Sequence, residues 1–163
     1  DALPAIALGV DVAEHDIMKR KPRKLSKSIW QEIRGFSIFA GIIAASVSSA
    51  VYYHAYTGNY AAEHLRTLVF TAIVVFELFL VFSIRSETHH YFTNFFKNRF
   101  LLAGVLTSFI LQLLAIYTPF FQNIFRSVPL SANDWILIVS FCTAGIIIIE
   151  LWKYTSKLIH KKN

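Results

Sequence analysis

The hydrophobic positions of this 163-residue chain fall into four long runs that are separated by polar and charged segments. The runs cover residues 35–53, 65–84, 100–117 and 135–152, and each one is apolar around the whole helical circumference. A helix that crosses a bilayer needs roughly 20 mostly apolar residues, whereas a helix of a soluble bundle has a polar face. The pattern therefore predicts an all-α, polytopic membrane bundle with four transmembrane helices.

A fifth apolar stretch, residues 1–10, is shorter and begins with Asp1. As a helix it would be about 15 Å long, which is half of a bilayer's hydrocarbon thickness. A chain terminus with a carboxylate at the membrane midplane would be very unfavourable. We therefore expect residues 1–10 to be the carboxyl-terminal half of a broken transmembrane helix, and the chain to be the tail of a larger membrane protein. Residues 11–34 would then be a basic cytoplasmic loop, and residues 35–163 the four-helix bundle.

Composition and charge agree with a membrane protein and predict its orientation. Charged residues make up 16% of the chain, against about 25% in soluble domains. The net charge of +6 does not indicate a nucleic-acid partner, because the basic residues lie between apolar runs and not on a face with exposed aromatics. Only Arg66 and Arg126 lie outside the segment before the first run, the connection between the second and third runs, and the tail. The positive-inside rule places these three segments, including the C-terminus, in the cytoplasm.

Glu77 is the sharpest candidate for chemistry, because it lies inside the second apolar run with no basic residue within two turns. It could be a neutral carboxyl that is hydrogen-bonded to a neighbouring helix, or it could bind or relay a cation. The pattern favours a cation, because an uncompensated carboxylate near the middle of a bilayer is costly. Asp1 is the natural second ligand, since hard cations take oxygen ligands. Pro4 weakens the helix nearby and would free backbone carbonyls.

Other polar residues have simpler interpretations. Glu150 and Lys153 are spaced to form an i,i+3 ion pair at a membrane interface. Gln112 could add an oxygen to an ion site, but a hydrogen bond that ties two helices is favoured. His89 and His90 have no cysteine and only Glu87 nearby, so a solvated loop is favoured over a metal site. Small residues on the first run predict close helix packing: Gly41, Ala44, Ala45, Ser46, Ser48 and Ser49.

No motif for covalent catalysis or nucleotide binding occurs in the chain. It has no Gly-rich phosphate loop and no G-x-S-x-G nucleophile motif. The single cysteine, Cys142, lies in an apolar run and indicates neither a disulfide framework nor a zinc site. We therefore expect the chain alone to be no enzyme and to bind no cofactor.

The first 23 residues, DALPAIALGVDVAEHDIMKRKPR, resemble the end of the sixth membrane helix and the following loop of type II P-type cation pumps. The Asp-x-Leu-Pro start, the Ala-Leu-Gly step, the Asp-Ile-Met turn and the final Pro-Arg all fit that pattern. The rest of the chain is similar by layout to helices seven to ten of such pumps. The segments YTPFFQNIF (117–125) and NDW (133–135) are also similar.

The resemblance implies an ion-transport function. In calcium pumps of this family the residues that match Asp1 and Glu77 ligate the transported Ca²⁺, and the loop around residues 16–23 lies close to the phosphorylation domain. The parent protein would use ATP and Mg²⁺, and its remaining membrane helices, its cytoplasmic domains and the lipid bilayer would be the partners of this chain. The phosphorylated Asp-Lys-Thr-Gly motif is absent here, so this piece would supply part of an ion site and hydrolyse nothing. Related pumps for Na⁺, K⁺ or Mn²⁺ share the scaffold.

Two other interpretations belong to different classes of protein. A stand-alone four-helix membrane protein could act as a partner-binding or regulatory subunit, and a start codon directly before Asp1 would favour it. A passive channel subunit would need a polar stripe along at least one run. Only Glu77 and Gln112 are available for such a stripe.

Overall fold

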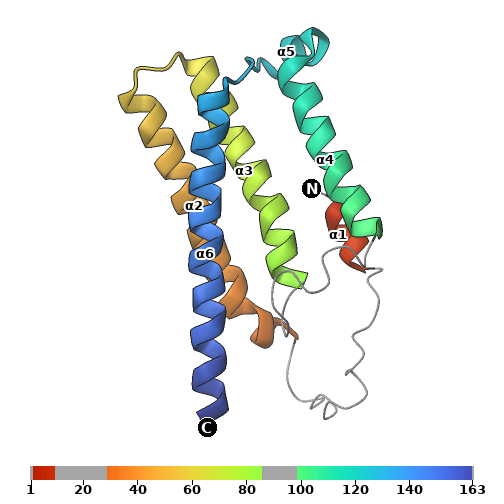
Figure 1. The fold of residues 1–163 in the computed structure, drawn as a ribbon, viewed down its shortest axis with the longest axis vertical. Coiled ribbons are helices and arrows are strands. Elements are labelled where there is room, and N and C mark those ends of the chain that lie inside the picture. The colour runs from red at the N-terminus through yellow and green to blue at the C-terminus, as the bar shows by residue number, and fades with distance from the viewer. Residues whose placement is uncertain (1, 10–28, 86–98, 163) are drawn as a thin grey trace.

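The structure, a computed structural model, describes residues 2–9, 29–85 and 99–162, all of which belong to an α-helical bundle (Figure 1). Four helices are long and apolar enough to span a membrane, so the predicted all-α, multi-pass fold is confirmed. Asp1, His89 and His90 lie outside the described residues. The candidate spans are Ile33–Thr57, Ala62–Ile84, Arg99–Tyr117 and Ala132–Ser156.

The helices alternate in direction along the bundle (Figure 1). We call the end at which the chain finishes the lower end, and the end with connections 58–61 and 126–131 the upper end. The helices are α1 (Ala2–Gly9), α2 (Ile29–Thr57), α3 (Ala62–Arg85), α4 (Arg99–Tyr117), α5 (Pro119–Phe125) and α6 (Ala132–Lys162).

Helices α2, α3 and α6 pack against one another along their length and form what we call the three-helix core. The helices come close to one another at Gly145 of α6, where an added Cβ would lie 2.8 Å from Val47 Cγ2 and 2.9 Å from Phe76 Cε2. One turn earlier, the buried thiol of Cys142 donates to the carbonyl of Ala72 at 3.5 Å. The buried apolar side chains of the core are Ala40, Val47, Val51, Ala55, Leu68, Ala72, Val75, Phe76, Ile138, Cys142, Ile146 and Ile149.

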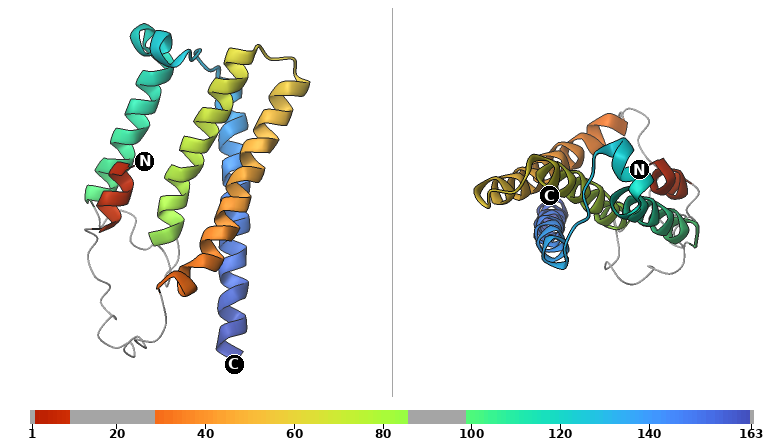
Figure 2. Two further views of the ribbon diagram at one scale, coloured as in Figure 1. Left: turned by 180° about the vertical axis from the view of Figure 1, so that it is seen from behind. Right: turned by 90° about the horizontal axis from the view of Figure 1, so that it is seen from above.

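Helices α1 and α4 form a second unit, which we call the outer pair. Helix α1 lies against the lower part of α4 and also contacts α3. Seen from above, the outer pair stands to one side of the three-helix core (Figure 2). A short helix that the sequence pattern did not predict, α5, follows α4 directly. It begins with Pro119, which suits a first helical position because its missing N–H has no partner there anyway.

Two features of α2 differ from the sequence-based expectations. Helix α2 begins at Ile29, inside the segment 11–34 that was predicted to be a loop. The division of the chain into segments stays a prediction, because residues 10–28 lie outside the described ranges. The predicted small-residue contact is seen in part: Ala44 packs against the core, whereas a Cβ added to Gly41 would meet no atom within 4 Å among the described residues. Val47 and Val51, one and two turns beyond Ala44, are buried in the same contact.

Candidate functional site

Glu77 lies in the lower half of α3, on the side of that helix that the three-helix core leaves uncovered. Its i−4 and i−7 neighbours, Ile73 and Phe70, are exposed on the same face. The opposite positions Ala72 and Phe76 are buried against α2 and α6. The packing of α3 therefore directs Glu77 away from the apolar core.

One carboxylate oxygen of Glu77 has no partner among the described residues. The Oε2 atom is buried and makes no hydrogen bond. Buried polar atoms in proteins are nearly always paired, and an unpaired one indicates a missing proton, ion or donor group. The predicted hydrogen bond from a neighbouring helix to a neutral Glu77 is therefore not present at this oxygen within the described residues.

The second predicted ligand, Asp1, lies outside the described residues, directly before the first residue of α1. Helix α1 contacts both α4 and α3, so the start of the chain and the helix that carries Glu77 belong to neighbouring elements. Pro4 is fully buried in the first turn of α1. The weakening of the helix expected at Pro4 stays a prediction, because the i−4 carbonyl that it would free lies before Asp1.

Gln112 ties the outer pair to the three-helix core near the middle of the bundle. Its Nε2 donates to Thr71 Oγ1 at 3.1 Å, and both residues are buried. This contact supports the interpretation of Gln112 as a helix tie. It is typical of polar side chains between membrane helices, which hydrogen-bond across the contact.

A polar cluster at the lower end joins α3 to α6. The predicted i,i+3 ion pair is confirmed, with Lys153 Nζ 2.9 Å from Glu150 Oε1. The same ammonium also donates to the backbone carbonyl of Ser83 at 2.6 Å, and the Ser83 hydroxyl donates to Glu150. Because Ser83 lies in the last turn of α3, its carbonyl has no partner within the helix, and Lys153 supplies one.

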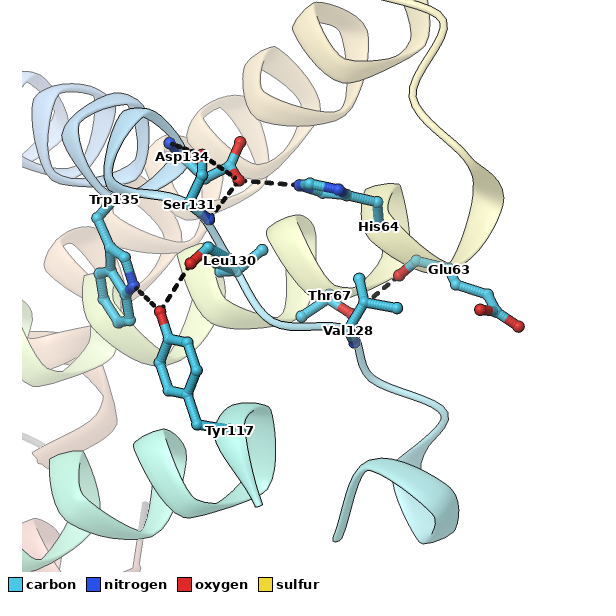
Figure 3. Close-up of polar contacts among 9 residues, drawn as sticks. All are labelled: Glu63, His64, Thr67, Tyr117, Val128, Leu130, Ser131, Asp134 and Trp135. Atoms are coloured by element: carbon cyan, nitrogen blue, oxygen red, sulfur yellow. Dashed lines mark hydrogen bonds and ion pairs between the residues drawn. The ribbon is translucent and has the colours of Figure 1, made fainter. Parts of the chain in front are cut away.

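A second polar cluster joins α3 to α6 at the upper end (Figure 3). His64 Nε2 and Asp134 Oδ2 are 2.9 Å apart, and only 4% of the Asp134 side chain is exposed. The same oxygen accepts hydrogen bonds from the backbone N–H and the hydroxyl of Ser131, each at 2.8 Å. The Ser131 hydroxyl in turn accepts from the N–H of Asp134 at 3.3 Å, which completes a capping box at the start of α6.

The connection between α5 and α6 is fastened to the neighbouring helices (Figure 3). The N–H of Val128 donates to Thr67 Oγ1 of α3 at 3.1 Å. The phenol of Tyr117, at the end of α4, donates to the carbonyl of Leu130 and accepts from Trp135 Nε1, both at 2.8 Å. The upper ends of α3, α4 and α6 are thus held together through one loop.

The sequence pattern alone missed the pairing of His64 with Asp134. The two residues are 70 positions apart, so no local spacing reveals their contact. One local signal was present, because Ser131-x-x-Asp134 is the spacing of a capping box and marks the start of a helix. Within the described ranges, no three His, Cys, Asp or Glu side chains gather to hold a metal ion. Further carboxylate ligands beside Glu77 would therefore come from outside those ranges.

Comparison with known proteins matches nearly the whole chain. The sequence model of the family described as "Cation transporting ATPase, C-terminus" covers residues 1–155. The chain is 38% identical over 146 residues to a calcium-transporting ATPase of Bacillus subtilis, which covers 85% of this chain and 16% of that protein. It is 34% identical over its full length to calcium-transporting ATPase 1 of Saccharomyces cerevisiae, of which it spans 17%. It is 30% identical over 94% of its length to human calcium-transporting ATPase type 2C member 1. The chain thus spans about a sixth of the length of these relatives.

Proposed function

The chain belongs to the cation-transporting ATPase family, as the C-terminal membrane region of such a protein, and from this we propose that it completes the ion pathway of an ATP-driven calcium pump. The relatives named above are calcium-transporting ATPases. ATP and Mg²⁺ would act in parts of the parent protein outside this chain. The role of this chain would be to hold part of the ion site in the membrane.

The observation that carries the proposal is the buried, unpartnered carboxylate oxygen of Glu77. A hard cation such as Ca²⁺ binds about six to eight oxygen atoms, largely from carboxylates and carbonyls. A bound Ca²⁺ would supply the positive charge that Glu77 lacks among the described residues, and Asp1 would supply a second carboxylate. The remaining ligands would come from membrane helices of the parent protein.

The surroundings of Glu77 suit a ligand that must stay in place while ions enter and leave. Helix α3 is fastened to α6 above Glu77 by the His64–Asp134 pair and below it by the cluster of Lys153 and Ser83. Sliding or rotating α3 would break both sets of contacts. Glu77 would therefore be a fixed ligand. Helix α1 has no such ties to α6 among the described residues, and it contacts α4 more than it contacts α3.

The proposed orientation places the lower end of the bundle in the cytoplasm. Arg85 and Lys153 lie at that end, whereas Arg66 and Arg126 lie at the upper end. The basic segments 11–34 and 153–162 continue from helices that end or begin at the lower end. Ions bound from the cytoplasm would leave at the upper end.

The test is the Glu77→Gln substitution in the intact parent protein, reconstituted in lipid vesicles. We expect the calcium concentration for half-maximal ATP hydrolysis to rise at least about tenfold, because one charged ligand is lost. The matched control is Glu63→Gln, which makes the same change at an exposed position at the upper end of the same helix. That variant should keep the calcium dependence of the unchanged protein.

An unchanged calcium dependence in the Glu77→Gln protein would remove Glu77 from the ion site. Calcium uptake into the vesicles should be measured beside ATP hydrolysis, because a ligand variant weakens both at low calcium. If another cation activated ATP hydrolysis by the unchanged protein and Ca²⁺ did not, the protein would still be an ion pump, but the choice of Ca²⁺ as its ion would be wrong.

A further inference from the structure

Helices α1 and α4 meet backbone to backbone at Gly104. A Cβ added to Gly104 would lie 3.2 Å from the carbonyl oxygen of Leu3, 3.4 Å from its carbonyl carbon and 3.5 Å from the nitrogen of Pro4. Pro4 is fully buried at this contact and has no N–H that would need space or a partner. The absence of a side chain at Gly104 therefore allows the first turn of α1 to rest directly on α4.

This contact differs from those of the other helical glycines in the described residues. An added Cβ at Gly9, Gly35 or Gly41 would meet no atom within 4 Å. At Gly145 it would meet side chains, and side chains can change rotamer. At Gly104 it would meet the backbone of another helix, which can give way only if α1 itself moves.

The first turn of α1 matters because Asp1 directly precedes it. Leu3 is two residues from Asp1, so the distance between α1 and α4 sets where the start of α1 stands. Helix α1 also contacts α3, the helix that carries Glu77. Calcium ligands lie about 2.3–2.6 Å from the ion, so a shift of a few tenths of an ångström in one carboxylate is felt at the site.

We propose that Gly104 is a positioning residue for the ion site. It lets α1 settle on α4 at the spacing that places Asp1 and Glu77 around one cation. The proposal rests on the function proposed above and assigns Gly104 no contact with the ion. It predicts that added volume at Gly104 weakens calcium binding more than it weakens the fold.

The experiment is the pair of substitutions Gly104→Ala and Gly104→Val in the intact parent protein, in lipid vesicles. We expect Gly104→Ala to raise the half-saturating calcium concentration about threefold to tenfold, and Gly104→Val to raise it further. The maximal rate of ATP hydrolysis at saturating calcium and the melting temperature of Gly104→Ala should stay near those of the unchanged protein. If Gly104→Val fails to fold, the alanine variant alone decides.

The matched controls are Gly41→Ala and Gly41→Val, which make the same changes in a membrane helix at a position where an added Cβ would meet no atom of the described residues within 4 Å. They carry the same change in helix propensity and should leave the calcium dependence unaltered. An unchanged half-saturation in Gly104→Ala would overturn the proposal, and a lowered melting temperature in that variant would then assign Gly104 to packing alone. The Glu77→Gln variant separates the two ideas, because a calcium effect there with none at Gly104 refutes only the positioning role.

Discussion

The three-helix core and the outer pair are built in different ways. The core is closed by interlocking apolar side chains and by polar clusters at both ends of α3. The outer pair rests on a backbone contact at Gly104, and the Gln112–Thr71 hydrogen bond ties it to the core. The core thus has polar ties at both ends of α3, whereas the outer pair is tied to it at Gln112 and at the upper end of α4. The two carboxylates proposed to bind the ion would come from different parts of the chain: Glu77 lies in the core, and Asp1 directly precedes α1 in the sequence.

The largest effect is expected at the close approach of helices at Gly145. Gly145→Leu would force a side chain into the space of Val47 and Phe76, whose atoms already lie 2.8 and 2.9 Å from an added Cβ. Overpacking by several carbons should lower the free energy of unfolding by about 3 kcal/mol. Thermal melting of the intact parent protein in detergent would measure the loss. Gly41→Leu adds the same volume at a position where an added Cβ would meet no atom of the described residues within 4 Å, so its melting temperature should stay close to that of the unchanged protein. Equal losses of stability in Gly145→Leu and Gly41→Leu would refute the close approach of helices at Gly145.

A smaller effect is expected at the lower polar cluster. Lys153→Met would leave the Ser83 carbonyl and the Glu150 carboxylate without their shared cation. An unpaired buried acceptor should lower the free energy of unfolding by about 2 kcal/mol. The same melting experiment applies, with Arg66→Met at an exposed position of α3 as the control for loss of a basic residue. If Lys153→Met and Arg66→Met had the same melting temperature, the lower polar cluster would not stabilise the position of α3.

The smallest effect is expected where the two units join. Gln112→Leu removes the hydrogen bond to Thr71, and such bonds between membrane helices contribute only about 0.6 kcal/mol. Thr71→Val should give a similar small loss, and the double variant should lose no more than either single variant. Losses that simply add would show that the two side chains do not act on each other.

The four spans were predictable because each depends on a local property, a long run of apolar residues. The Glu150–Lys153 pair was also predictable, since i,i+3 spacing on one helix brings the two side chains together. The contacts of Ser83 and His64 with α6 join residues 67 to 70 positions apart, so they depend on how the helices pack. The short α5 begins just after Thr118, which follows a span directly, and no hydrophobic period is long enough there to mark it.

The candidate site was predictable in part for the same reason. Glu77 stands out in the sequence because a lone carboxylate inside a membrane-spanning run is costly unless a cation, a proton or a hydrogen-bond donor pairs with it. The burial of its Oε2 atom could not be inferred, because it depends on which sides of α3 the neighbouring helices occupy. Gly104 carried no signal in the sequence, because only the arrangement of α1 on α4 distinguishes it from Gly41.

The burial of Cys142 makes this chain suited to chemical labelling. Cys142 is the only cysteine among the 163 residues, and its thiol is buried beside the carbonyl of Ala72, out of reach of water-soluble reagents. A cysteine introduced at an exposed site such as Asn59, in the upper connection, should therefore be the position in this chain that a membrane-impermeant maleimide modifies. Such a label would report which side of the membrane the upper end faces.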